Sequence, residues 1–263
     1  MSVLLEARGV CKYFGGLHAV EGVDMKVNQG DIYGIIGPNG AGKTTFFNLC
    51  TSVYSLTAGQ IVFDGHDISN MKSEQIARLG MARTFQNIHL FSSMSVLKNV
   101  EVGCHIQTKT NMLDAIFHTP RYQRESRETT EKSMEILKMI GLEAYRDVNA
   151  GNLAYGMQRK VEIARALALD PKILLLDEPA AGMNITESAD LKEFILKLNE
   201  MGYTIVVIEH DMKFVMGTCN NLLVLNFGQK ICEGKPAEVV RNEEVIRAYF
   251  GKGTFVKEAV KEL

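Results

Sequence analysis

The chain has 263 residues, with 46% hydrophobic and 23% charged side chains and a formal net charge of −2. These proportions are ordinary for a globular protein. Most nucleic-acid-binding domains carry a basic excess, so the near-neutral charge argues against a nucleic-acid-binding protein. The length is sufficient for a substantial core in one large domain, or in one domain with an additional lobe.

The five cysteines are scattered along the chain, with no C-x-x-C pair and no zinc-binding spacing. This pattern predicts reduced thiols in a cytosolic protein. The first residues lack the basic segment and long apolar run of a signal peptide. No stretch approaches the roughly 18 apolar residues that a spanning helix needs. We therefore expect any membrane association to depend on partner proteins.

The first 70 residues have a strand-like pattern. Short β-rich runs cover residues 3–8, 23–27, 31–37 and 61–63, and glycine-containing turns separate them. The run at 31–37 leads into a glycine-rich loop, after which a helix is predicted to start near Lys43. The segment therefore reads strand, loop, helix.

The middle of the chain is predicted to be helical, over residues 74–81 and over most of 95–142. Met134, Leu137 and Ile140 recur at the spacing of an amphipathic helix. Four apolar residues of the same region are open to two interpretations, packing within a helical lobe or contact with a partner. These residues are Met112, Leu113, Ile116 and Phe117.

The C-terminal part alternates between helix and apolar strand. Residues 173–176 and 204–208 are continuous apolar runs, which are typical of strands buried on both faces. Residues 222–225 and 229–232 are predicted to form a hairpin. The charged tail that follows residue 252 is expected to be frayed.

Residues 37–44 read GPNGAGKT, a full match to the phosphate-loop pattern G-x-x-x-x-G-K-[ST]. The glycines let the backbone approach a phosphate, and backbone N–H groups with the helix N-terminus then face the anion. Lys43 is predicted to reach the β- and γ-phosphates, and the Thr44 hydroxyl to ligate Mg²⁺. A glycine-rich turn with a chance lysine is the alternative, which the preceding strand and following helix disfavour. The residues predicted to bind phosphate are Gly37, Pro38, Asn39, Gly40, Ala41, Gly42, Lys43, Thr44 and Thr45.

An apolar strand ends in two carboxylates, Asp177 and Glu178. Buried carboxylates are costly unless they meet a cation, and Mg²⁺ prefers oxygen ligands, water and phosphate. Asp177 is predicted to hold the metal, directly or through water, and Glu178 to act as general base towards the attacking water. Taken alone, the same pattern also fits a solvated strand end, and the phosphate loop favours the functional interpretation.

The order of these elements resembles that of the ATP-binding cassette ATPases over nearly the whole chain. The further segments that carry the resemblance are Thr84-Phe85-Gln86 (glutamine loop), 153–157 (signature), 181–184 (D-loop), Glu209-His210-Asp211 (switch histidine) and Phe14 (adenine stacking).

The resemblance implies a role for each segment. Gln86 would touch the metal or water, His210 would hydrogen-bond the γ-phosphate, and Phe14 would stack on adenine, with Tyr13 as the rival for that role. Each has an ordinary alternative: a polar loop residue for Gln86, a surface or capping histidine for His210, and core packing for Phe14. A helix beginning at Gly156 would face the nucleotide of an opposite subunit.

The signature segment departs from the family's LSGGQ pattern. Ala154 stands in place of serine, Tyr155 in place of a glycine and Met157 in place of glutamine, whereas Gly156 and the basic helix after it remain. Ala154, Tyr155 and Gly156 are still expected to contact nucleotide, but without the serine hydroxyl. The effect of this change on hydrolysis stays open.

Within the family, the chain is most similar to the branched-chain amino acid transporter ATPases. The similarity lies in NLAYG at 152–156, EPAAGMN at 178–184, a helical insert at about 104–131 and VIRAYFG at 245–251. A related group that handles urea or amides leaves the solute open. A non-transport ATPase acting on nucleic acid or ribosomes, and a regulatory nucleotide binder without turnover, are the rival functions.

The resemblance implies an α/β phosphate-loop fold with a RecA-like core, an antiparallel β subdomain and an α-helical subdomain. The core with the β subdomain is expected over about 1–85 and 168–250, the helical subdomain over about 86–167, and a tail over 251–263. The implied cofactors are ATP and Mg²⁺. The implied partners are a second cassette ATPase, in a homo- or heterodimer, two membrane permeases and, indirectly, an extracytoplasmic solute-binding protein. The chain would work at the cytoplasmic face of the membrane.

Overall fold

The computed structural model describes residues 2–105, 110, 114 and 116–250. The chain divides into two compact units: unit 1 comprises residues 1–83 and 172–263, and unit 2 comprises residues 84–171. Met112 and Leu113, which the sequence singled out, lie outside the described residues. Among the described residues, no helix combines the length and the apolar character that a membrane crossing requires.

Unit 1 contains a four-stranded antiparallel sheet with strand order β2-β1-β4-β5. Its strands are β1 (Val3–Phe14), β2 (Leu17–Asn28), β4 (Ala58–Phe63) and β5 (His66–Asp67). The first two strands are much longer than the sequence predicted. The pairing of β1 with β2 shifts register between Ala7 and Val10, beside Gly9 with its positive φ of 53°. Because such bulges interrupt the apolar alternation, the pattern showed only fragments of each strand.

The second sheet of unit 1 has six strands in the order β10-β9-β3-β8-β7-β6. Neighbouring strands from β9 through β6 pair in parallel, and β10 closes the sheet as an antiparallel hairpin with β9. Their bounds are β3 (Ile32–Ile36), β6 (Met81–Arg83), β7 (Ile173–Asp177), β8 (Thr204–Ile208), β9 (Asn221–Asn226) and β10 (Gln229–Gly234). Every residue of β3, β7 and β8 is buried, as expected for the centre of a parallel sheet. The predicted strand at 204–208 and the predicted hairpin are confirmed.

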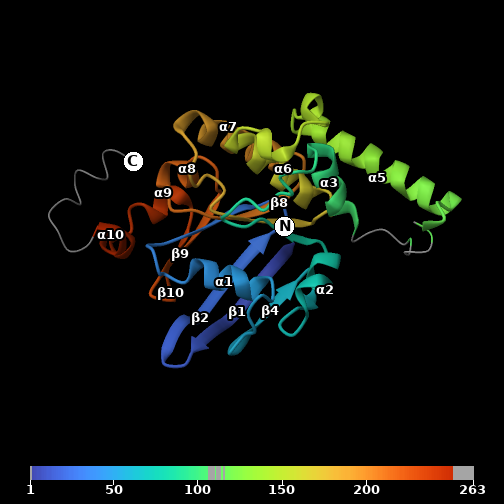
Figure 1. Ribbon diagram of the computed structural model, residues 1–263. Coiled ribbons are helices and arrows are strands. Elements are labelled where there is room, and N and C mark those ends of the chain that lie inside the picture. The colour runs from blue at the N-terminus through green and yellow to red at the C-terminus, as the bar shows by residue number, and fades with distance from the viewer. Residues whose placement is uncertain (1, 106–109, 111–113, 115, 251–263) are drawn as a thin grey trace. The chain divides into compact units, whose positions relative to one another are not determined.

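The parallel arrangement brings the carboxyl ends of β3, β8 and β7 to one edge of this sheet, of which Figure 1 labels β8, β9 and β10. The phosphate loop follows β3, Asp177 ends β7, and Glu209 follows β8 directly. Ligands of open α/β sheets bind at the carboxyl ends of the strands, which is where these three segments meet.

Six helices accompany the sheets in the described part of unit 1. They are α1 (Lys43–Cys50), α2 (Ser73–Arg78), α7 (Ile185–Glu200), α8 (Met212–Met216), α9 (Pro236–Val239) and α10 (Glu243–Phe250). The helix predicted at 74–81 is wrong at its C-terminal end, because Met81 begins β6. That strand has only three residues and is stabilised by parallel pairing with β7, which local periodicity does not reveal.

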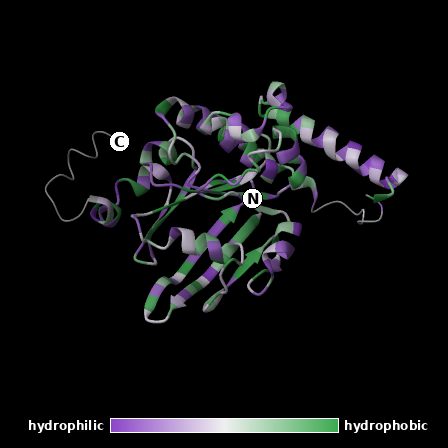
Figure 2. Cartoon of the chain, in the orientation of Figure 1, coloured by the Kyte–Doolittle hydropathy of each residue, from purple (hydrophilic) through white to green (hydrophobic). Residues whose placement is uncertain are grey.

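Unit 2 is mainly helical among its described residues. Its helices are α3 (Val96–Cys104), α5 (Pro120–Met139) and α6 (Tyr155–Leu167), with 3-10 turns at Glu143–Tyr145 and Ala150–Asn152. Helix α3 packs closely on α6: a Cβ added at Gly103 would lie 2.2 Å from the Arg165 carbonyl oxygen. Helix α5 is strongly hydrophilic along its length (Figure 2), and only Ser133, Ile136 and Leu137 of it are buried.

Candidate functional site

The loop between β3 and α1 depends on glycine at two points of close backbone contact. A Cβ at Gly37 (φ 151°) would lie 2.1 Å from the Leu225 carbonyl oxygen, and one at Gly42 (φ 98°) would lie 2.5 Å from that of Ala19. At Gly40 (φ 78°) no atom lies within 4 Å of an added Cβ, so this residue faces open space. Gly37 and Gly42 therefore allow the loop to pack directly against neighbouring backbone, and Gly40 leaves room for a ligand to approach the loop backbone.

Lys43 begins helix α1 and lies under the loop. Only 6% of the residue is exposed, and its Nζ donates hydrogen bonds to the carbonyl oxygens of Gly37 (2.7 Å) and Pro38 (3.1 Å). Burial lowers the pKa of Lys43, whereas the carboxylates of Glu178 and Asp177 act in the opposite direction. The loop thus holds a largely desolvated cation, which an anion in the pocket above would stabilise.

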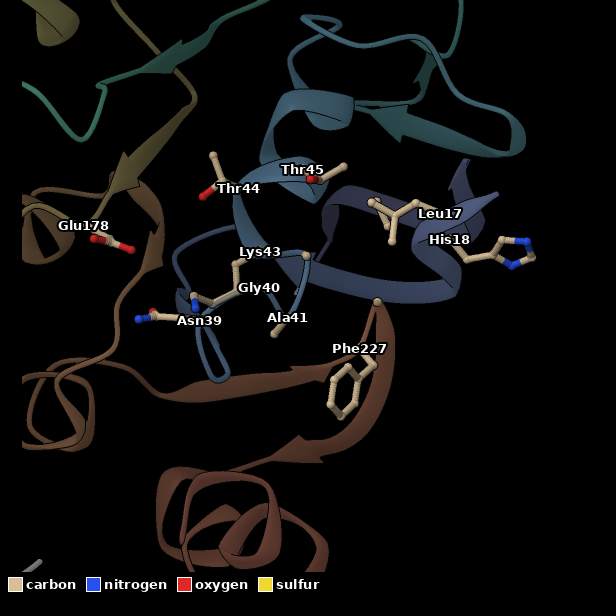
Figure 3. Close-up of a pocket in the computed structure, with 13 residues that line it drawn as sticks. Leu17, His18, Asn39, Gly40, Ala41, Lys43, Thr44, Thr45, Glu178 and Phe227 are labelled. Atoms are coloured by element: carbon tan, nitrogen blue, oxygen red, sulfur yellow. The ribbon is translucent and has the colours of Figure 1, made fainter. Parts of the chain in front are cut away.

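A pocket of about 640 Å³ opens above this loop (Figure 3). The predicted residues 39–45 and Glu178 all line it, and in Figure 3 the Glu178 carboxylate faces the loop that carries Lys43. The lining residues are Leu17, His18, Ala19, Asn39, Gly40, Ala41, Gly42, Lys43, Thr44, Thr45, Glu178, Phe227 and Gly228. A buried cation, a hydroxyl and a carboxylate therefore meet in one cavity.

Glu178 has an unusual backbone conformation for a non-glycine residue, with φ of 43°. Its N–H donates to the Ile208 carbonyl oxygen at 2.9 Å, which ties the residue to the end of β8. Such conformations cost about 1–3 kcal/mol and persist where the surrounding structure imposes them. The side chain is 16% exposed, and Oε2 lies 3.8 Å from Nδ1 of His210. Glu178 is thus aimed into the pocket by its backbone.

His210 lines a second pocket, of about 620 Å³, together with the segment 180–185. Its Nδ1 lies 3.8 Å from Oε2 of both Glu178 and Glu209. Glu209 accepts hydrogen bonds from the N–H groups of Ala180 (2.9 Å) and His210 (3.2 Å). Burial raises the pKa of Glu209, and these backbone donors oppose the shift. His210 therefore lines the second pocket and lies beside the carboxylate of Glu178, which lines the first.

Asp177 is buried at the end of β7 and is paired with an arginine. Its Oδ2 accepts a hydrogen bond from Nη2 of Arg83 at 2.7 Å. Nη1 of the same guanidinium donates to Asn48 Oδ1 (2.7 Å) and Thr51 Oγ1 (3.0 Å). Sequence reasoning identified Asp177 but missed Arg83. A buried carboxylate requires a cation, and this requirement was the available signal for Arg83. The sequence-based prediction assigned the cation to the metal alone.

Replacement of Arg83 by methionine is expected to lower the free energy of unfolding by about 3–5 kcal/mol. Removing one partner of a buried ion pair leaves the other charge uncompensated, and both side chains here are less than 10% exposed (7% and 4%). Urea unfolding at neutral pH measures the change. Arg78→Met is the matched control, since its partner Glu74 and Arg78 itself are exposed. Equal losses in both variants would contradict the importance of the buried pair.

In unit 2, Arg159 of α6 binds the backbone of the glutamine loop. This fully buried guanidinium donates to the carbonyl oxygens of Phe85 (2.7 Å) and Gln86 (2.7 Å), and pairs with Glu162 at 2.6 Å. The Gln86 residue itself is exposed. The sequence suggested only a basic helix here; the structure shows that one of its cations holds the loop.

The signature segment forms the start of α6, one residue earlier than predicted. Ala154 is the N-cap residue and provides no side-chain hydrogen bond to the helix end. Tyr155 is the first helical residue and is 39% exposed. Serine at the N-cap position accepts a hydrogen bond from the first turn, whereas alanine leaves these N–H groups without that partner.

The two aromatic candidates for base stacking do not line the pocket. Phe14 is 44% exposed and meets Tyr54 edge-on, with 5.4 Å between ring centroids. Tyr13 stacks on His18 at 4.1 Å and donates its hydroxyl to Glu21. The lining instead includes Leu17, His18 and Phe227, which carry no recognisable motif. Leu17 and His18 follow the turn between β1 and β2, and Phe227 lies in the turn between β9 and β10. Both turns lie beside the phosphate loop only in the folded chain.

Comparison with known proteins agrees with this arrangement. The family model for the ABC transporter matches residues 20–181, and the model for the branched-chain amino acid ATP-binding cassette transporter matches residues 229–254. The high-affinity branched-chain amino acid transport ATP-binding protein BraF of Pseudomonas aeruginosa is 44% identical over 250 residues, covering 95% of this chain and 98% of BraF. The corresponding protein LivG of Escherichia coli K12 is 43% identical over the same shares of the two chains.

Solved structures support the same assignment. A nucleotide-free ATP-binding cassette from an ABC transporter has a TM-score of 0.83 and 33% identity, covering 95% of this chain and 100% of that one. The ADP conformation of the cassette MJ1267 has a TM-score of 0.84 and 32% identity, covering 96% and 100%. The predicted α/β phosphate-loop fold is therefore confirmed. The chain belongs to the ABC transporter family and is one of its ATP-hydrolysing cassettes.

Proposed function

We propose that the chain hydrolyses MgATP to drive the import of branched-chain amino acids through membrane permeases. The observation that carries the proposal is the convergence of Lys43, Thr44 and Glu178 on one pocket. The solute class is supported by the family model matching residues 229–254 and by relatives that are named branched-chain amino acid transport ATP-binding proteins.

In this mechanism the loop 37–45 binds the phosphates through its N–H groups, and Lys43 binds the β- and γ-phosphates. Glu178 accepts a proton from the attacking water, because its carboxylate faces the pocket. His210 contributes a hydrogen bond to the γ-phosphate, next to Glu178. Gln86 senses the nucleotide from the loop that Arg159 holds.

The residues present fit a magnesium ion bound together with phosphate. Thr44 is exposed and lines the pocket, and Asp177, which is buried outside the lining residues and paired with Arg83, is proposed to reach the ion directly or through water. Within the described part of the chain, no group of three His, Cys, Asp or Glu side chains could hold a metal by itself. Mg²⁺ commonly needs only one or two protein ligands, since phosphate and water supply the others. When bound, it neutralises charge on the phosphate oxygens.

We further infer that two cassettes act together, with Ala154, Tyr155 and Gly156 of one facing the nucleotide of the other. A dimeric cassette structure, MJ0796, has a TM-score of 0.73 with 26% identity to this chain. In this proposal unit 1 is the catalytic core with its β subdomain, and unit 2 is the helical subdomain. Phe14, which is 44% exposed and lies outside the lining of the pocket, is kept as the proposed stacking partner of the adenine on the strength of the family resemblance alone. The pair binds two permeases at the cytoplasmic face of the membrane, and an external binding protein delivers the solute.

Uptake measurements in the source organism test the solute. Deletion of the gene should abolish uptake of radiolabelled leucine, isoleucine and valine, and expression of the wild-type chain should restore it. A Glu178→Gln chain, expressed at the same level, should not restore uptake. Loss of urea uptake with unchanged leucine uptake would contradict the amino acid assignment and favour the amide-transporting group.

A further inference from the structure

The turn between β9 and β10 holds an aromatic residue in a conformation that disfavours it. Asn226 pairs with Gln229, so the hairpin loop consists of Phe227 and Gly228, with φ of 46° and 79°. Two-residue hairpin loops of this kind favour asparagine or glycine at both positions. A phenylalanine in this left-handed backbone conformation is strained, so the conformational preference of the residue does not explain its presence at the first position of the loop.

Contacts with two other segments hold this turn in position. The Gly228 N–H donates to the Ala41 carbonyl oxygen at 3.0 Å, and the Glu21 N–H donates to the Gly228 carbonyl oxygen at 2.8 Å. A Cβ added at Gly228 would lie 2.9 Å from the Ala19 carbonyl oxygen. The turn is thus fastened to the phosphate loop on one side and to β2 on the other. The Phe227 ring is therefore carried at a defined place beside the phosphate loop.

That place is the rim of the nucleotide pocket. Phe227 is 84% exposed, yet it lines the cavity with Leu17 and His18. In Figure 3, Glu178 lies on one side of the phosphate loop, whereas Phe227, Leu17 and His18 lie on the other. A nucleotide whose terminal phosphate approaches Lys43 and Glu178 would direct its nucleoside towards the opposite side.

We propose that Phe227, together with Leu17 of the same pocket lining, forms a nucleoside-contacting wall. The inference rests on the proposed function, which assigns the phosphates to the loop around Lys43. An exposed aromatic ring loses contact with water when a base or ribose lies against it, and base–aromatic stacking tolerates different bases. The ring of Phe14 has different neighbours: it meets Tyr54 edge-on, and Lys12 Nζ lies 5.0 Å from its centroid. The proposed contact of Phe227 with the nucleoside is therefore separate from any contact that Phe14 makes.

Two ligands that differ only in the nucleoside test the inference. The affinities of the purified chain for ATP and for inorganic tripolyphosphate are measured by isothermal titration calorimetry. Phe227→Asn removes the ring and suits the left-handed backbone of the turn, and Phe227→Tyr keeps the ring. We expect Phe227→Asn to weaken ATP and GTP binding alike, by about 5- to 20-fold, as for a partly exposed stacking contact. Tripolyphosphate binding should be unchanged, and Phe227→Tyr should bind ATP as the wild type does.

Phe117→Asn is the matched control, because Phe117 is 75% exposed and belongs to unit 2. It should leave both affinities unchanged. Wild-type ATP affinity in Phe227→Asn would overturn the inference. Equal weakening of ATP and tripolyphosphate would also overturn it, since the ring would then act through the phosphate loop. A wild-type chain that binds neither ligand would instead contradict the proposed function.

Discussion

Glu178→Gln should retain ATP binding and lower the steady-state rate of hydrolysis by about 10² or more. Glutamine preserves the size of the side chain that lines the pocket beside Lys43, but it accepts no proton from the attacking water. The backbone hydrogen bond from Glu178 to Ile208 does not involve the side chain and is kept in the variant, so the amide should occupy the position of the carboxylate. Phosphate release and equilibrium ATP binding, measured on the same preparation, separate the two effects.

Glu200→Gln is the control for this experiment. Glu200 is exposed at the end of α7 and does not line the pocket. Its replacement should leave both turnover and ATP binding as in the wild type. A Glu178→Gln chain that hydrolysed ATP at the parent rate would remove Glu178 from the role of general base.

Lys43→Ala should weaken ATP binding by about 10- to 100-fold, because a charge-assisted contact with phosphate contributes about 1.5–3 kcal/mol. The buried Nζ now bonds to the carbonyl oxygens of Gly37 and Pro38, directly under the pocket. Titration with a fluorescent ATP analogue measures the affinity. Lys26→Ala changes a lysine of β2 that does not line the pocket and should bind normally. Unchanged affinity in Lys43→Ala would count against a phosphate-binding role.

The same lysine predicts the pH dependence of binding. Burial lowers the pKa of Lys43 from its ordinary value of 10.5, so the charge that attracts phosphate is lost at a lower pH than usual. ATP affinity of the wild type should therefore fall in the alkaline range below pH 10.5, and that of Lys43→Ala should not. The effect of the same group on folding stability has the opposite sign. The unfolded chain binds the Lys43 proton more tightly than the folded chain does, so burial of the charged side chain lowers the free energy of unfolding at low pH. This cost disappears as the pH rises.

Where a motif consists of consecutive residues, the sequence predicted the start of the element to within a residue. Helix α1 begins at Lys43 and β8 covers 204–208, as the sequence indicated. Both segments are defined by neighbours in the chain: a glycine-rich loop followed by a helix, and an apolar run that is buried on both faces. The long strands β1 and β2 were recovered only as fragments, because bulges break their alternation.

Residues whose environment comes from distant parts of the chain were missed. Arg83 precedes its carboxylate partner by 94 positions, and it lies on a three-residue strand without a periodic signal. Arg159 looked like one member of a basic helix, yet it binds the carbonyl oxygens of Phe85 and Gln86, more than 70 positions away. Phe227 carries no motif at all. Its relation to the phosphate loop exists only after β9 has paired with β3.

The sequence by itself determines that this chain has a phosphate loop, an acidic pair after a buried strand and the segment order of a cassette ATPase. These features are local, because a few consecutive residues set the backbone path and the chemistry of each. Only the tertiary structure decides which side chains surround them: Arg83 against Asp177, Arg159 against the glutamine loop and Phe227 at the rim of the pocket. The contacts of Arg83 and Phe227 arise when strands that are far apart in sequence pair in one sheet, and that of Arg159 arises when helix α6 packs against the loop after β6. No local pattern in the sequence records either event.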